Sequence, residues 1–262
     1  RGLQAAQMNR FHIGIGNNLF PLIPGNDLRG CINDAHQMNA TLDAHFGAAV
    51  DERLIENSTR AQFNEAMEAA IAGAATGTCD YITISISTHG LIYGTGTPDN
   101  FLQALVFSDF DGKVGDGLLD DVAFKAFLDR IPRSVGVEIW IDACHSATAT
   151  RAIGLKSRSL ISPNFDPTKH SVKPSAITSK SRTPEDNIVV WSACRDDETA
   201  ADQWSATLKE GWGAFTNAFC SAYNEAGNGA TRRQIMSQLL LNLLASGVAQ
   251  HPQISFQQSA TT

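Results

Sequence analysis

Apolar and polar positions follow two different periods along this chain. Alternation with β-branched residues predicts strands, and Tyr81–Ser87 (YITISIS) is the clearest case. Apolar residues three or four positions apart predict helices, as between Asn33 and Phe46. Strands are predicted over Phe11–Gly16, Arg53–Ile55, Tyr81–Ser87, Gln103–Phe107, Val135–Ile141, Asn187–Ser192 and Gln253–Phe256. Helices are predicted over Asn33–Phe46, from a capped start within Ser58–Gln62, and over Asp120–Arg130, Trp212–Tyr223 and Arg232–Leu244.

Strands and helices alternate through most of the chain, which indicates a mainly parallel sheet with helices on both faces. We therefore expect an α/β fold with a mostly parallel sheet of about six strands. Gly90–Asn100 is Gly-rich and polar, which predicts a loop. Residues 151–187 lack sustained periodicity and are predicted to be a long surface loop within a single domain, since strands flank them on both sides.

Composition excludes several classes of protein. The 262 residues carry 20 Lys and Arg against 27 Asp and Glu, a formal charge of −7. Without a basic stripe we expect no nucleic-acid binding, and no apolar run reaches the ~18 residues of a membrane helix. The first ten residues lack the apolar core of a signal peptide. Five Cys without a CxxC pair argue against a disulfide scaffold or zinc cluster and predict reduced thiols and a cytoplasmic location.

Reactive residues follow two of the predicted strands. Tyr81–Ser87 leads into Thr88-His89-Gly90, and Val135–Ile141 leads into Asp142-Ala143-Cys144. If these strands are neighbours, His89 and Cys144 meet at one sheet edge, where parallel sheets bind ligands. An imidazole can hold a thiol as thiolate, and the backbone N–H groups of Gly90 and Cys144 can stabilise an oxyanion. From these residues alone, a buried inert Cys and a polar loop His remain the alternative.

Five segments in fixed order strengthen the catalytic interpretation. They span roughly residues 10–225 and resemble those of caspase-like cysteine peptidases, in particular the metacaspases and orthocaspases. The segments are Arg29-Gly30-Cys31-Ile32-Asn33-Asp34-Ala35, Ser87-Thr88-His89-Gly90, Asp142-Ala143-Cys144-His145-Ser146, Trp191 to Asp202 and Gly213-Ala214-Phe215-Thr216.

The resemblance implies a role for each matching residue. Cys144 would be the nucleophile and His89 the general base and acid. Asp34 and Asp142 would form a pocket for a basic side chain, lined also by Ser87 and Cys31. Two carboxylates in a partly desolvated pocket repel each other unless a cation enters, and an Arg can bind both. We therefore expect cleavage after Arg, then Lys.

Simpler interpretations of the acidic residues stay open at this point. Asp34 could stabilise a helix N-terminus, and Asp142 could cap a strand end. The sequence also departs from the family pattern, because Thr88 and Ala147 replace glycines. The Cβ of Thr88 could narrow the crevice beside the base.

By the same resemblance, residues 1–150 correspond to a large subunit, 151–187 to a linker and 188–262 to a small subunit. The linker is rich in Lys and Arg, so an enzyme cutting after basic residues could cleave itself there. We expect a monomer that acts on protein or peptide substrates with basic residues. Alternatives are a catalytically weak scaffold or signalling module, and another α/β hydrolytic or redox enzyme using the same thiol.

A metal site is a weaker prediction. The acidic stretch from Asp109 fails the EF-hand template, because Val114 stands where that loop needs Gly. Some metacaspases bind calcium through other carboxylates, and Asp109, Asp120 and Asp121 match part of that set. Arg151 stands where the family has a further acidic ligand. We expect that no cofactor is required and treat calcium as a possible ligand.

Overall fold

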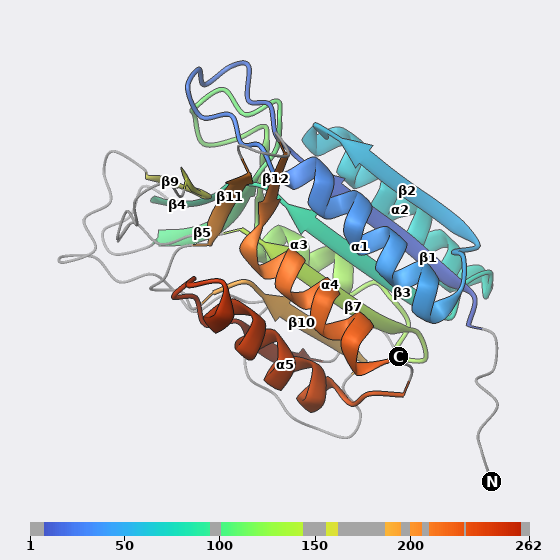
Figure 1. Cartoon of the computed structure of the whole chain (residues 1–262). Coiled ribbons are helices and arrows are strands. Elements are labelled where there is room, and N and C mark those ends of the chain that lie inside the picture. The colour runs from blue at the N-terminus through green and yellow to red at the C-terminus, as the bar shows by residue number, and fades with distance from the viewer. Residues whose placement is uncertain are drawn as a thin grey trace, which may run out of the picture.

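A six-stranded sheet forms the centre of the computed structural model (Figure 1), which describes residues 8–94, 101–143, 156–161, 187–194, 200–205, 210–227 and 229–257. In spatial order the strands are β13 (Gln253–Gln257), β10 (Ile188–Ser192), β7 (Gly136–Asp142), β3 (Tyr81–Ser87), β1 (Arg10–Gly16) and β2 (Asp51–Glu56). Only β13 is antiparallel to its neighbour. The predicted α/β fold is confirmed.

Helices cover both faces of this sheet. Helices α1 (Cys31–Phe46), α4 (Ala214–Ala226) and α5 (Arg232–Ala245) lie on one face, and α2 (Arg60–Thr76) and α3 (Asp121–Leu128) lie on the other (Figure 1). Within the described residues, no helix is long and apolar enough to cross a membrane.

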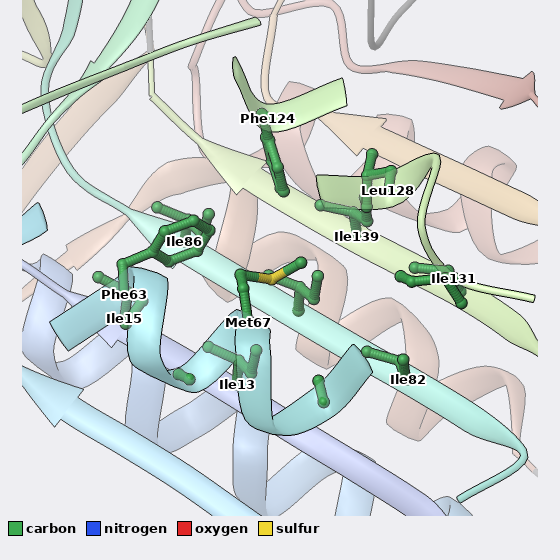
Figure 2. Close-up of a cluster of buried hydrophobic side chains, with 14 of the residues drawn as sticks. Ile13, Ile15, Phe63, Met67, Ile82, Ile86, Phe124, Leu128, Ile131 and Ile139 are labelled. Carbon is green, nitrogen blue, oxygen red and sulfur yellow. The ribbon is translucent and has the colours of Figure 1, made fainter. Parts of the chain in front are cut away.

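The apolar core beneath α2 and α3 explains why those helices pack where they do. Phe63 and Met67 of α2 point at isoleucines of the sheet such as Ile13 and Ile86, and Phe124 of α3 closes the same cluster (Figure 2). A capping box between Thr59 and Gln62 fixes the start of α2. The sequence predicted a capped helix start within Ser58–Gln62, which is confirmed.

Two small sheets lie beside the carboxyl end of β3. One has the order β6-β5-β4-β9, and the other β12-β11-β8. Their strands are β4 (Gly90–Gly94), β5 (Phe101–Val106), β6 (Leu118–Asp120), β8 (Lys156–Ser157), β9 (Ser159–Ile161), β11 (Ala201–Ser205) and β12 (Glu210–Gly213).

The small sheets correct three predictions. The Gly90–Asn100 stretch is not a loop throughout, because β4 occupies its first five residues and buries Leu91 and Ile92. The long loop predicted over 151–187 contains β8 and β9. The helix predicted from Trp212 begins only at Ala214, because Trp212 belongs to β12. In each case long-range strand pairing decides the local structure, which a single-sequence pattern does not carry.

Truncating Phe63 tests the packing of α2 on the sheet. This side chain is fully buried against Phe107 and Phe124, so Phe63→Ala is expected to lower the free energy of unfolding by about 3–5 kcal/mol. Urea denaturation measures the change. The matched control is Val122→Ala on exposed α3 surface, which is expected to change little. A decrease in the free energy of unfolding for Phe63→Ala as small as that for the control would contradict this packing.

Candidate active site

The two strands that carry the predicted reactive residues are neighbours. β3 and β7 run parallel with Ser87 opposite Asp142, and the Thr88 N–H donates to the Asp142 carbonyl at 3.3 Å. β3 and β7 therefore end at the same edge of the sheet, as expected. Cys144 and Ala147 lie outside the described residues.

The His89 ring is oriented by a backbone carbonyl. Its Nε2 atom lies 2.6 Å from the Asn26 carbonyl oxygen, and the Phe20 ring packs against it at 4.8 Å between centroids. Because a carbonyl oxygen can only accept a hydrogen bond, Nε2 carries the hydrogen. The neutral ring then has its lone pair on Nδ1, the arrangement that a general base requires.

Two buried carboxylates form an acidic pocket that holds an Arg of the same chain. The Arg158 Nη2 lies 2.7 Å from Asp34 Oδ2, and its Nη1 lies 3.1 Å from Asp142 Oδ1. Nη1 also donates to the Ser87 hydroxyl at 2.5 Å. The Arg158 side chain is 0% exposed, with Asp34 and Asp142 at 1% and 2%. This burial is tolerated because the single positive charge of the guanidinium lies between two carboxylates, and its Nη2 and Nη1 atoms donate hydrogen bonds to Asp34 and Ser87.

Residues from α4 and the end of β12 hold the two carboxylates in place. The Gly213 N–H donates to Asp34 Oδ1 at 2.7 Å. The Thr216 N–H and hydroxyl both donate to Asp142 Oδ2, at 3.0 and 2.7 Å. Each carboxylate therefore keeps its other oxygen for the guanidinium. A β-carbon on Gly213 would lie 2.1 Å from Asp142 Oδ2 and 2.7 Å from Arg158 Nη1, so the pocket needs a glycine there.

Burial raises the pKa of Asp34 from its ordinary 3.8 to about 6, and the Asp142 charge adds to this rise. The positive charge of Arg158 is the largest influence in the opposite direction, followed by hydrogen bonds from Ser87 and Gly213. A carboxylate with this pKa needs its cation in order to stay ionised close to neutral pH.

The backbone of Arg158 forms a bend between the short strands β8 and β9. Its carbonyl oxygen accepts the Gly90 N–H at 2.8 Å, and its own N–H donates to the Ala200 carbonyl at 3.3 Å. On the N-terminal side β8 pairs antiparallel with β11, and on the C-terminal side β9 pairs parallel with β4. Arg158 thus has its side chain in the acidic pocket and its carbonyl on the predicted oxyanion donor.

The structure brings together most of the predicted site. Asp34, Asp142 and Ser87 all contact the guanidinium of Arg158, and Gly90 contacts its carbonyl. The simpler roles of Asp34 and Asp142, a helix terminus and a strand cap, do not account for these contacts. Cys31 begins α1 and is buried in an apolar cluster with Phe20 and Leu28.

The side chain of Thr88 is buried and has hydrogen-bond partners within the protein. Its hydroxyl donates to the Val106 carbonyl, and the Asn17 amide donates to the hydroxyl at 3.3 Å. These contacts tie the side chain to β5 and to the end of β1, and the residue is fully buried.

The carboxylates of the possible calcium site already have protein partners. Asp109 accepts the Arg60 N–H at 3.0 Å, and Asp120 caps α3 through the Ala123 N–H at 2.7 Å. Asp121 is buried in the first turn of α3. Across the described ranges, no group of three or more His, Cys, Asp or Glu could hold a metal ion. These residues as placed do not fit a calcium ion, and calcium dependence stays a prediction.

Four residues of the site carried no assigned role in the sequence. Gly213 and Thr216 lie in one of the five segments that resemble the family, and this resemblance could have marked them as site residues. Asn26 contributes a backbone carbonyl, which any residue could supply. Arg158 is one of seven basic residues in 151–187, and composition does not distinguish it from the others.

Comparisons with known proteins identify the family. Residues 12–261 match the model of the caspase domain, so the chain belongs to the caspase-domain family. The chain is similar to metacaspase-9 of Arabidopsis thaliana, with 24% identity over 87% of this chain and 88% of that protein. It is also similar to metacaspase-1 of Debaryomyces hansenii, with 25% identity over 88% of this chain and 61% of that protein. The chain is therefore of the metacaspase type, which supports a cysteine-type peptidase.

Solved structures agree with the fold. A protein of Geobacter sulfurreducens superposes with a TM-score of 0.65 at 19% identity, covering 97% of this chain and 94% of that one. Caspase-1 of Spodoptera frugiperda superposes with a TM-score of 0.61 at 13% identity, covering 97% and 88%. At these identities the likeness concerns the fold alone.

The Asp34–Arg158 contact is expected to weaken with acid. Arg158 lowers the pKa of Asp34, so their attraction is complete at neutral pH and is lost as the pH falls through about 6. In a Cys144→Ala chain, protection of the Arg158 and Leu160 amides from hydrogen exchange should fall about tenfold between pH 7.5 and 5, after correction for intrinsic rates. Asp34→Asn should show the low protection at both pH values. Protection that does not change with pH would contradict the contact.

Proposed function

We propose that this protein is a cysteine endopeptidase that cleaves peptide bonds after Arg, and more slowly after Lys, through a Cys144–His89 dyad. The observation that supports this most strongly is the position of Arg158. Its side chain lies between Asp34 and Asp142, and its carbonyl accepts the Gly90 N–H. An internal segment with these contacts serves as a guide to how a substrate would bind.

The proposed reaction uses groups at the ends of β3 and β7. His89, with Nε2–H on the Asn26 carbonyl, accepts the Cys144 thiol proton at Nδ1. The thiolate attacks the carbonyl carbon after the Arg, while the Gly90 N–H stabilises the oxyanion. His89 then protonates the departing amine, which leaves an acyl-enzyme. Water, deprotonated by His89, hydrolyses the thioester and regenerates the thiol.

The preference for Arg over Lys follows from the geometry of the pocket. The two carboxylates lie on different nitrogens of the guanidinium, and Ser87 shares one of them. A planar fork satisfies these separated acceptors together, whereas an ammonium is a single charge centre on a shorter reach. A neutral or acidic side chain would leave two buried carboxylates without a cation.

Self-cleavage follows from the same contacts. Because Arg158 occupies the acidic pocket and its carbonyl accepts the Gly90 N–H, the proposed enzyme would cut the bond between Arg158 and Ser159. Until that cut, the intact segment competes with other substrates for the acidic pocket. The product would be a chain ending at Arg158 and a second chain beginning at Ser159.

Peptide turnover tests the specificity. Among matched fluorogenic peptides ending in Arg, Lys, Asp or Ala, the Arg peptide should be cleaved fastest and the Lys peptide more slowly. The Asp and Ala peptides should show little turnover, with kcat/KM for Arg at least about a hundredfold above that for Ala. Cys144→Ala should abolish turnover, and assays with and without calcium measure any dependence on the metal. A folded protein that cleaves none of these peptides, or cleaves Asp and Arg peptides equally, would contradict the proposal.

Removing Arg158 tests the internal cleavage site. In Arg158→Ala the fragment that begins at Ser159 should disappear, as measured by mass spectrometry of the incubated protein. Arg182→Ala changes another basic residue of the same linker and serves as the matched control, which should still release that fragment. Equal release of the Ser159 fragment from Arg158→Ala and wild type would exclude Arg158 as the recognised residue.

A further inference from the structure

The segment that follows Arg158 has a binding surface of its own. In β9, Ser159 lies opposite Gly90, and Leu160 lies opposite Leu91 of β4. This pairing places β9 at the edge of the β6-β5-β4-β9 sheet. Within this sheet, β4 has β5 on one side and β9 on the other, so the β4 edge beside Gly90 is the edge that receives the segment.

Leu160 packs into an apolar cluster on one face of that sheet. Because Leu160 and Leu91 are opposite each other in register, their side chains lie on the same face. Leu160 is half-buried against a cluster of Phe20, Leu28, Cys31, Leu91, Tyr93, Ala104, Val106, Phe110 and Leu118. Phe20 of this cluster also packs on the His89 ring. The apolar surface therefore extends from the proposed catalytic base to the second residue beyond Arg158.

The segment after Arg158 makes backbone contacts with β4 and side-chain contacts with the apolar cluster, and these two kinds of contact have different consequences for a substrate. Strand pairing with β4 depends on backbone groups, which every peptide possesses, so it aligns a substrate without selecting its sequence. The apolar cluster contacts only alternate residues of the paired strand, and Leu160 is the residue that reaches it. Selection by side chain at this surface is therefore expected at the second position after the cut.

We infer that β4 and this apolar cluster form a binding site for the part of a substrate that follows the cleaved bond, with a preference for a large apolar residue at the second position after Arg. The inference rests on the proposed function and goes beyond it. It defines the preferred substrate as Arg, any residue, then Leu or Met, with the chain continuing past the cut.

Four internally quenched peptides test this site on the self-processed protein. They are identical except for Leu, Met, Ser or Asp at the second position after Arg. Values of kcat/KM for Leu and Met should exceed those for Ser and Asp by about tenfold or more. An Arg peptide with a fluorogenic amine directly after the Arg has no residue at this site and measures recognition of Arg alone.

The outcomes separate the inference from the function on which it rests. Turnover of all four peptides at equal kcat/KM would overturn the inference and leave the peptidase intact. No turnover of any Arg substrate, including the fluorogenic amide, would overturn the peptidase proposal and the inference together.

The chain itself offers a second test. Leu160→Asp should slow release of the Ser159 fragment about tenfold, whereas Leu160→Met, which conserves volume, should release it at nearly the wild-type rate. A thermal melt of each variant checks that both remain folded. Equal rates for Leu160→Asp and Leu160→Met in folded proteins would contradict the site.

Discussion

The pairing of Asp34 and Asp142 around one guanidinium is the interaction on which the account of this site depends. Two carboxylates from different elements, α1 and β7, are almost fully buried and would repel each other if left alone. A cation between them converts that repulsion into a charge-assisted hydrogen bond with Asp34 and an ion pair with Asp142. The raised pKa of Asp34 has the same origin, since burial opposes its charge and Arg158 restores it. The pocket is therefore adapted to a positively charged side chain.

The rest of the fold positions the groups around this pairing. The parallel neighbours β3 and β7 deliver Ser87 and Asp142 to the same edge, and the first turn of α1 delivers Asp34. The junction of β12 and α4 contributes Gly213 and Thr216. They donate hydrogen bonds to Asp34 Oδ1 and Asp142 Oδ2, the carboxylate oxygens that do not face the guanidinium. The two small sheets extend the edge of the main sheet, and the segment around Arg158 lies between them. In the proposed function, recognition of a basic side chain and of an extended strand takes place at this one edge.

The sequence predicted the elements whose local pattern and tertiary environment agree. Tyr81–Ser87 is a strand with the predicted bounds, because β-branched alternation and burial favour the same conformation. Asp34, Asp142 and Ser87 were found through motifs in the right order, and the structure brings them together. β4 was missed because a short apolar run between glycines is typical of a loop until a partner strand pairs with it. The role of Arg158 depends on a contact 124 positions away along the chain, which composition does not encode.

Labelling by a peptidyl electrophile tests the central claim most directly, because it joins the acidic pocket to the thiol in one measurement. An arginyl chloromethyl ketone is expected to modify Cys144 of the self-processed protein, as located by peptide mass mapping. An alanyl or aspartyl analogue is expected not to modify it, and Asp34→Asn combined with Asp142→Asn is expected to remove the difference between the reagents. Modification of Cys31, Cys79, Cys194 or Cys220 instead, or equal labelling by the aspartyl reagent, would contradict an acidic pocket that serves a Cys144 nucleophile.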